Sequence, residues 1–554
     1  MIYEIFLILI ALGVVALVPK KQNVMRLSAF LVAGIAGILC YSLYQHWQMG
    51  YHDRFIYHWV SSAYYPIDIT LFSTPQNYVQ LLPFGFIATI VMFFNVFYSL
   101  EEKRLSLNAQ ICLLCSAIIL LFCSQNTIQL LTGACAIDIF SFYIINDSRV
   151  RRRFIFYNLL ADMGLVMLFA LIWGYLESNQ LTDLVRYKRF GAHKDLLCLV
   201  LLVIVFIKMG LFMFHSAVVE WQNLTLNRIM TLLFLSTPLV GFVLLQKLQV
   251  LLPLSDYSYP MIKLWAGLSM AWGFSGCIMK DDIRAKGLYF NMMYIGFVLG
   301  LFAEGVNPMQ QKFLLLLIGE FLLQASFLIL LIGASNETLV SSMGNFIRGL
   351  KLTFVLSVVV IMVIFHTLNL FWAENHGWTQ TYALMFLIGS SHVLRQVYWG
   401  NSRADERVLA HLKNANFVYL SIILATSIGV FALYPHLELY SLWALGIFVC
   451  LLWIGPLRFT SIAYRNETLQ NTDIFAKIYQ TLIITPILIL GRILWLTIDF
   501  LIIERTVIYS LRRVVLLFVQ SFQKIHNDYR FSYPLFYILG IGVLSASFYL
   551  TIGK

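Results

Sequence analysis

Long apolar runs constrain the fold of this chain more than any other feature of its sequence. Runs of roughly twenty apolar residues recur from Ile2 to Leu550, and charged residues rarely interrupt them. A helix rises about 1.5 Å per residue, so a run of this length crosses the hydrocarbon core of a bilayer. With 60% hydrophobic and 12% charged residues, the 554-residue chain has more apolar surface than a soluble domain can bury. The sequence therefore predicts an all-α polytopic membrane protein.

The apolar runs predict about sixteen transmembrane helices. The predicted spans are 2–19, 26–46, 77–99, 108–124, 127–146, 155–176, 197–218, 228–250, 260–279, 286–304, 313–334, 352–373, 381–399, 416–434, 437–456 and 533–552. Most of the 38 lysines and arginines fall in loops that follow odd-numbered spans. Positively charged loops face the cytoplasm, so both termini are expected outside. The expected location is a bacterial cytoplasmic (inner) membrane, multi-pass, or the mitochondrial inner membrane.

Charge and cysteine placement exclude several classes of function. The net charge of +11 lies mostly in short loops, which is an orientation signal and not a nucleic-acid surface. All eight cysteines lie in apolar runs, and the pair Cys112 and Cys115 supplies at most two of the four ligands that structural zinc takes. We see no GxGxxG or Walker pattern. The sequence predicts no metal, no cofactor in this chain and no nucleic-acid partner.

Two ionisable residues inside the predicted spans are candidates for function. Lys208 lies within an apolar run, and an ammonium at membrane depth costs several kcal/mol unless it is paired or hydrated. His215 follows seven residues later, about two helical turns along the same face.

The stretch around these two residues, Ile207 to Leu244, resembles the central signature of the antiporter-like membrane subunits of respiratory complex I and Mrp-type antiporters. The signature of that family is Gly-Lys-Ser-Ala-Gln, followed by Pro-Leu-His-x-Trp and then by Pro-Thr-Pro-Val-Ser-Ala-Leu-Ile-His. Lys208 falls on the family lysine, His215 on its first histidine and Leu233 on its second, while none of the prolines is kept. The resemblance implies two inverted five-helix repeats, spans 4–8 and 9–13, with spans 7 and 12 broken.

Two aspartates in neighbouring spans are candidate partners of Lys208. Asn158 and Asp162 match the family's Asn-Arg-Val-Gly-Asp, and an acid beside a buried lysine lowers the cost of its charge. A purely structural ion pair between spans 6 and 7 is the alternative. Cys135 stands at the family's functional glutamate, and Asp138, one turn further on, is its candidate replacement or a locally paired aspartate.

The second repeat carries a different set of polar residues. The stretch 280–298 resembles the family's charged turn entering a span, and we assign it an anchoring role. Glu320 replaces a family histidine, and Gln324 replaces the lysine that follows it. Glu374 takes the place of a terminal family lysine, although it is equally a residue of a solvated helix end.

The end of the chain resembles complex I subunit L, in which a long lateral helix precedes the last span. Pro486, Arg492, Leu494, Trp495 and Asp499 match that pattern. A helix from Ile487 to His526 would be about 60 Å long. The residues that we assign to this lateral helix are Arg492, Trp495, Asp499, Arg505, Arg512 and Arg513. A further span over 480–503 is the alternative, and its two internal charges disfavour it.

The resemblance implies a division of the chain into N-terminal spans with an interfacial loop, two five-helix units, two further spans, the lateral helix and a terminal span. The boundaries are 1–107, 108–252, 253–400, 401–470, 471–532 and 533–554.

The resemblance further implies an antiporter-like, proton-translocating membrane subunit of an NADH:quinone oxidoreductase, closest to subunit L, with no catalytic residues of its own. Its partly degenerate proton path would contain Lys208, Asp162, His215, Glu320, Gln324, Glu374 and Asp138. Its expected partners are other membrane subunits, the lipid bilayer, and protons or Na⁺. The alternatives are an Mrp-type Na⁺/H⁺ antiporter subunit, the proton-conducting partner of a bicarbonate-uptake system, and a non-transporting structural subunit.

Overall fold

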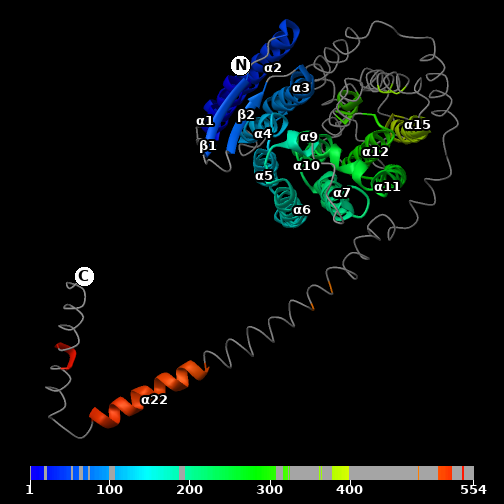
Figure 1. Cartoon of the computed structure of the whole chain (residues 1–554). Coiled ribbons are helices and arrows are strands. Elements are labelled where there is room, and N and C mark those ends of the chain that lie inside the picture. Colours follow the sequence, from blue (N-terminus) through cyan, green and yellow to red (C-terminus); the bar gives the residue numbers. More distant parts are fainter. Residues whose placement is uncertain are drawn as a thin grey trace. The chain divides into compact units, whose positions relative to one another are not determined.

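The computed structural model describes part of the chain, in two compact units that we treat separately. The described residues are 2–17, 22–50, 54–60, 67–72, 75–98, 106–185, 194–306, 316–321, 323–324, 377–398, 509–526 and 539–541, with the single positions 361, 364, 368, 485 and 489. The first unit is Met1–Asn471 and the second is Thr472–Lys554. Figure 1 shows that the described part of the first unit is a bundle of helices with one small hairpin.

Four apolar helices open the first unit. They are α1 (Ile2–Leu17), α2 (Gln22–Met49), α3 (Pro75–Tyr98) and α4 (Ser106–Phe122). Helix α1 packs on α4 and α2 packs on α3. These helices fall where the first four spans were predicted, because each is a continuous apolar run.

The predicted interfacial loop, which lies between the predicted spans 26–46 and 77–99, contains regular structure that the sequence analysis missed. Strand β1 (Arg54–Val60) pairs antiparallel with β2 (Ile67–Phe72), and an irregularity interrupts the ladder between His58 and Val60. Gln129 attaches this hairpin to the next helix: its Oε1 accepts from the backbone N–H and the hydroxyl of Thr70, each at 3.0 Å, and its Nε2 donates to Thr70 O at 2.9 Å. Asn126 Nδ2 also donates to the Asp68 carbonyl at 2.6 Å.

Side-chain caps begin the next two helices, α5 (Thr127–Ile144) and α6 (Ser148–Leu176). The Asn126 side chain accepts from the backbone N–H of Gln129 at 2.6 Å, which satisfies one of the free donors in the first turn of α5. Asp147 does the same for α6, accepting from Val150 at 3.0 Å and Arg149 at 2.8 Å. These hydrogen bonds hold the pKa of Asp147 below its ordinary value.

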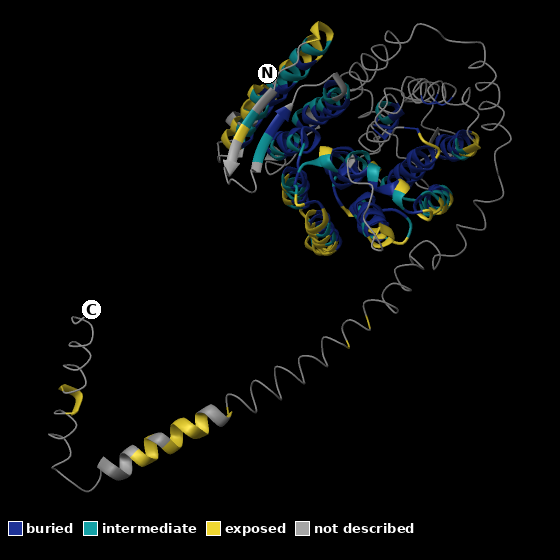
Figure 2. Ribbon diagram, viewed as in Figure 1, coloured by how far each residue is buried: buried dark blue, intermediate teal, exposed yellow. Residues whose placement is uncertain are grey.

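Helix α6 has one buried face and one exposed apolar face (Figure 2). The exposed face carries Ile155, Phe156, Leu159, Leu160, Met163, Val166 and Met167. An apolar face of this length is suited to contact with lipid. The opposite face packs on α5 and α7.

A glycine ends the next helix, α7 (Lys194–Met209), in the middle of the predicted span 197–218. Gly210 has φ +62°; its N–H donates to Ile207 O at 3.0 Å, and the Leu211 N–H donates to Phe206 O at 3.2 Å. This pair of bonds is a Schellman motif, which stops a helix without a proline. The chain resumes as α8 (Ser216–Val219) and the 3₁₀ helix η4 (Glu220–Asn223).

The predicted span 228–250 is also interrupted. It forms α9 (Leu226–Leu235) and α10 (Thr237–Lys247), which meet at Ser236. Ser236 has non-helical backbone angles, and Pro238 lies in the first turn of α10, where a missing N–H costs nothing. The Ser236 hydroxyl accepts from the backbone N–H of Thr237 at 2.5 Å.

Helix α12 (Ile283–Ala303) lies in the interior of the protein. It packs on α11 (Ser258–Met279) and α15 (Gly377–Tyr398), and all of its residues except the partly exposed Arg284 are buried (Figure 2). Asp282 caps it by accepting from the Arg284 N–H at 2.7 Å. Short 3₁₀ helices, η2 (Leu181–Val185) and η5 (Gln249–Leu254), complete the described part of this unit.

Among the residues that the structure describes, six helices are long and apolar enough to cross a membrane by length and composition. Helices α1 and α4 are shorter apolar helices. This supports a helical, polytopic membrane protein. The predicted break in span 12 and the predicted spans 14 and 15 lie outside the described residues.

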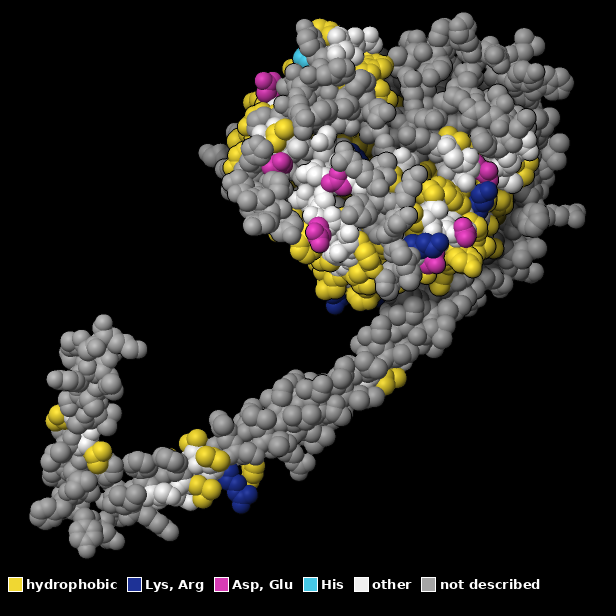
Figure 3. Space-filling model, viewed as in Figure 1, with side chains coloured by type: hydrophobic (Ala, Val, Ile, Leu, Met, Phe, Trp, Pro, Cys, Tyr) yellow, Lys and Arg dark blue, Asp and Glu magenta, His cyan; other side chains and the backbone are white. Residues whose placement is uncertain are grey.

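The described part of the second unit is dominated by α22 (Tyr509–His526). Arg512 and Arg513 are exposed on this helix, as are Val514, Val515 and Leu517. Figure 3 shows its basic side chains next to hydrophobic ones. The other predicted lateral-helix residues, Arg492, Trp495, Asp499 and Arg505, lie outside the described residues.

Candidate functional site

Lys208 occupies the last turn of α7, two residues before Gly210, the glycine that ends the helix. Its side chain is completely buried. The carbonyl groups at a helix C-terminus carry partial negative charge, so this position favours a cation. The Schellman stop at Gly210 therefore places the ammonium where the backbone helps to hold it.

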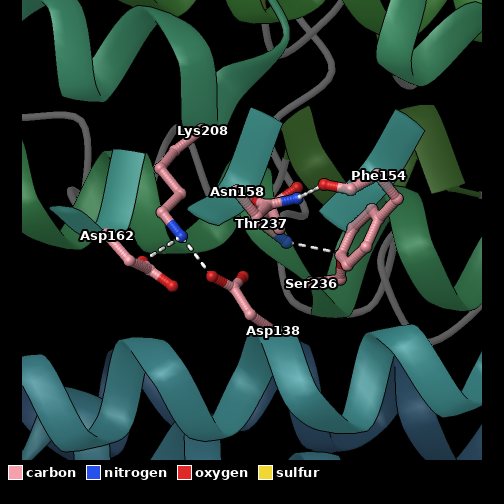
Figure 4. Close-up of polar contacts among 7 residues, drawn as sticks. All are labelled: Asp138, Phe154, Asn158, Asp162, Lys208, Ser236 and Thr237. Atoms are coloured by element: carbon pink, nitrogen blue, oxygen red, sulfur yellow. Dashed lines mark hydrogen bonds and ion pairs between the residues drawn. The ribbon is translucent and has the colours of Figure 1, made fainter. Parts of the chain in front are cut away.

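Two carboxylates from two other helices reach this ammonium (Figure 4). Lys208 Nζ donates to Asp162 Oδ1 of α6 at 2.6 Å, and it forms a second, shorter ion pair with Asp138 Oδ2 of α5. The side chains of Asp138 and Asp162 are 9% and 17% exposed. The structure thus brings together three residues that are far apart in sequence, and we call them the Lys208 cluster.

The Lys208 cluster has more acidic groups than basic ones. One ammonium and two carboxylates sum to a formal charge of −1 when all three are ionised. A buried net charge is costly in a medium of low dielectric constant. Binding one proton makes the cluster neutral, so the cluster is suited to take up and release a single proton.

Close packing fixes α7 between its neighbours on either side of Lys208. A Cβ added at Gly164 of α6 would lie 3.0 Å from the Ile204 side chain, and one added at Gly241 of α10 would lie 2.6 Å from the Met209 side chain. Helix backbones approach this closely only where a side chain is absent. Figure 4 shows Asn158, Ser236 and Thr237 around the same cluster.

Cys135, at the position of the family's glutamate, lies near the cluster without replacing the acid. It is half-buried on α5, one turn before Asp138, and its thiol interacts electrostatically with Asp162, Asp138 and Lys208. Asp138 supplies the carboxylate that contacts the lysine. The proposed substitution of Asp138 for the glutamate agrees with this arrangement and stays a prediction as to role.

Polar contacts from α11 hold the break after α7. His215 is buried at its end, and Trp272 Nε1 of α11 donates to His215 Nε2 at 3.1 Å. Phe212 N donates to Ser269 Oγ at 3.1 Å. The acceptor role of Nε2 requires a histidine whose other ring nitrogen carries the proton. The segment 210–215 is therefore a positioned polar break in the bundle.

A second buried polar group lies among α11, α12, α15 and residues 316–321 and 323–324. Tyr382 Oη of α15 donates to Glu320 Oε1 at 2.5 Å, and Gln324 Nε2 donates to Gly287 O of α12 at 2.8 Å. All three side chains are buried. Glu374, the remaining predicted path residue, lies outside the described residues.

The sequence analysis missed a buried lysine in this group. It placed Lys286 in a charged turn at the start of a span, whereas the structure leaves Lys286 only 1% exposed. Its Nζ donates to Cys277 O of α11 at 2.8 Å. A lysine in the first turn of an apolar helix was the available signal, but hydropathy alone could not show that α12 is enclosed by protein.

Within the described parts of the chain, no group of three or more His, Cys, Asp or Glu residues could hold a metal ion.

Solved structures, but no protein-family model and no curated protein, match this chain. A chain of the Mrp complex from Dietzia sp. DQ12-45-1b aligns with a TM-score of 0.64 and 11% identity over 99% of this chain. A chain of the membrane-bound sulfane sulfur reductase, an archaeal respiratory membrane complex, aligns with a TM-score of 0.60 and 14% identity, covering 76% of this chain and 74% of that one.

The chain shares the fold of these membrane-complex subunits. It spans 63% of the length of the Mrp chain that it matches.

Proposed function

We propose that this chain is an antiporter-like subunit of a multisubunit membrane complex and that it passes protons through the Lys208 cluster. The observation that carries the proposal is the buried ammonium of Lys208, held by Asp138 and Asp162 at the end of an interrupted helix. Buried ionisable residues within membrane helices are costly, and they commonly mark ion and proton pathways.

The charge of the cluster suggests how it works. When a carboxylate takes a proton from water, its attraction for the Lys208 ammonium falls, because the pair no longer has opposite charges. The ammonium can then release a proton toward the polar break at 210–215. Return of the carboxyl proton to Lys208 restores the ion pair, so each cycle moves one proton and leaves the cluster unchanged.

We further propose that the complex is an NADH:quinone oxidoreductase and that this chain is its subunit-L-like member. The matches from Pro486 to Asp499 favour this assignment, since they follow the lateral-helix pattern. The second candidate is an Mrp-type Na⁺/H⁺ antiporter subunit, favoured by the fold match to an Mrp chain over 99% of the sequence. Copurification with redox subunits, through a tag on this chain, supports the first and contradicts the second.

Proton uptake by the purified complex in proteoliposomes tests the proposal. A K⁺ diffusion potential drives uptake, an entrapped pH dye reports it, and an imposed Na⁺ gradient tests for exchange. The variants are Lys208→Met and Asp162→Asn, and the matched control is Lys263→Met, an exposed lysine of α11 that pairs with Glu304 at 2.8 Å.

We expect Lys208→Met to lower the uptake rate by roughly tenfold or more, which corresponds to about 1.4 kcal/mol or more in the barrier. The control should match the wild type. Uptake that is equal in all four proteins would refute the proposal and leave the non-transporting structural subunit as the better description. Uptake that depends on bicarbonate would favour the bicarbonate-uptake alternative.

A further inference from the structure

The structure contains a second buried lysine, which is not part of the proposed proton path through the Lys208 cluster. Lys286 lies on α12, a helix with no exposed residue, and its side chain is among the largest fully buried ones in the described part of the chain. The only hydrogen bond described for its Nζ is the one to Cys277 O, at 2.8 Å. An ammonium has three N–H donors and a positive charge, so one backbone carbonyl neither accepts from all three donors nor neutralises the charge.

The surroundings of Lys286 differ from those of Lys208 in charge. No described ion pair joins Lys286 to a carboxylate, whereas Lys208 has two such pairs. Ionisable side chains lie on the turn before α12 and on the elements next to it. Those described are Lys280, Asp281, Asp282, Tyr259, Lys263, Cys277, His215, Glu220, Arg228, Glu320, Tyr382 and His392. Of these, Cys277 and Asp281 interact electrostatically with Lys286.

Cys277 contacts Lys286 and lies within electrostatic range of the buried carboxyl of Glu320. Its carbonyl accepts from Lys286 Nζ, and its thiol interacts electrostatically with both Lys286 and Glu320. On the far side, Glu320 accepts from Tyr382 at 2.5 Å. Gln324, one turn after Glu320, reaches the backbone of Gly287, the residue next to Lys286. A titratable amine and a titratable carboxyl are thus both buried near one residue of α11.

We propose that Lys286 and Glu320 form a second proton-exchange site in this chain, with Tyr382 holding the carboxyl and the charged turn at 280–282 supplying protons from water. In one exchange, Lys286 accepts a proton from water at that turn and becomes an ammonium; it then releases the proton toward Glu320, whose carboxylate becomes a carboxylic acid. This inference rests on the proposed function, since it extends the same proton movement into the second half of the bundle.

Substitutions at Lys286 in the purified complex, with the same proteoliposome assay, test the site. Lys286→Met removes the exchangeable proton, and Lys286→Arg keeps the charge and the donors but does not release a proton. Both should lower proton uptake by roughly tenfold. Lys286→His should restore uptake with a pH profile moved to lower pH, because histidine ordinarily loses its proton at lower pH than lysine. Lys263→Met is again the matched control.

The outcomes separate this inference from the proposed function. Wild-type complex that moves no protons refutes both. Uptake that is lost in Lys208→Met and unchanged in Lys286→Met refutes the second site alone. Recovery in Lys286→Arg to the wild-type rate also refutes it, since a fixed charge then suffices. If the complex with Lys286→Met does not assemble, Lys286→Arg and Lys286→His still distinguish the two roles of Lys286. A purely structural cation predicts wild-type uptake in Lys286→Arg, whereas a proton-exchanging group predicts low uptake in Lys286→Arg and recovery in Lys286→His.

Discussion

The stop at the end of α7 predicts a measurable cost for replacing one glycine. Gly210→Ala places a Cβ on a residue with φ +62°, which costs about 1–2 kcal/mol for a residue other than glycine. The same Cβ would lie 2.3 Å from Val218 Cγ2, and overpacking of this kind costs about 1–3 kcal/mol. We therefore expect Gly210→Ala to lower the free energy of unfolding by about 2–5 kcal/mol.

Reversible unfolding of the purified protein in mixed micelles with increasing SDS, followed by tryptophan fluorescence, measures this cost. A double-mutant cycle with Val218→Ala separates the two contributions, because that change removes the methyl group that the new Cβ would meet. The steric part, about 1–3 kcal/mol, should reappear as coupling between the two sites, while the backbone part should persist.

Gly174→Ala on α6 is the matched control. No heavy atom lies within 4 Å of an added Cβ there, and the residue is helical. We expect this variant to be neutral or more stable by about 0.5–1 kcal/mol. A Gly210→Ala protein as stable as the control would mean that the helix does not end at Met209, and the account of how Lys208 is positioned would be wrong.

Three other predictions follow from contacts outside this stop. Lys208→Met should lower the free energy of unfolding by about 3–5 kcal/mol, because it leaves the buried Asp138 and the partly buried Asp162 carboxylates without a cation, and adding Asp138→Asn should recover part of the loss in the same unfolding assay. Gln129→Ala should expose residues 54–72 to faster hydrogen exchange, since Thr70 loses three hydrogen bonds worth about 0.5–1.5 kcal/mol each; unchanged exchange would contradict the described attachment of the hairpin. The Asp147 carboxyl, which caps α6, has a pKa below its ordinary value of 3.8 in the folded protein. Its contribution to the free energy of unfolding is therefore complete above pH 3.8 and is lost as the pH falls through the lower folded pKa. In a pH series of melting curves, the stability difference between the wild type and Asp147→Ala should shrink over that range.

Sequence reasoning located the Lys208 cluster because its signals are local. A lysine in an apolar run and an aspartate in each of two neighbouring spans are visible one span at a time, and the resemblance supplied the pairing. The described structure joins Asp162 and Asp138 to the same ammonium. Their role in transport is still a prediction.

Other features depended on information that no single span contains. The hairpin was missed although Ile67–Phe72 alternates apolar and polar residues, because the aromatic residues around it also suit a membrane interface. The helix stop at Met209 depends on one glycine, and glycine is common in membrane helices that continue. Lys286 was assigned to a charged turn at the start of a span, because burial of α12 comes from its neighbours and not from its own sequence.

The enclosure of nearly all of α12 has a consequence for how the protein is made. With a mean hydropathy of 1.3, against 2.0 for α6 with its exposed apolar face, α12 is the least apolar of the six candidate spans. Its polar residues Lys286 and Asn291 would contact lipid if α12 moved from the insertion machinery into the bilayer as a single helix. We expect α11 and α12 to enter the bilayer together as a helical hairpin, with α12 shielded at first by α11 and later by α15, so that the residues of the second polar group are joined only at a late stage of biogenesis.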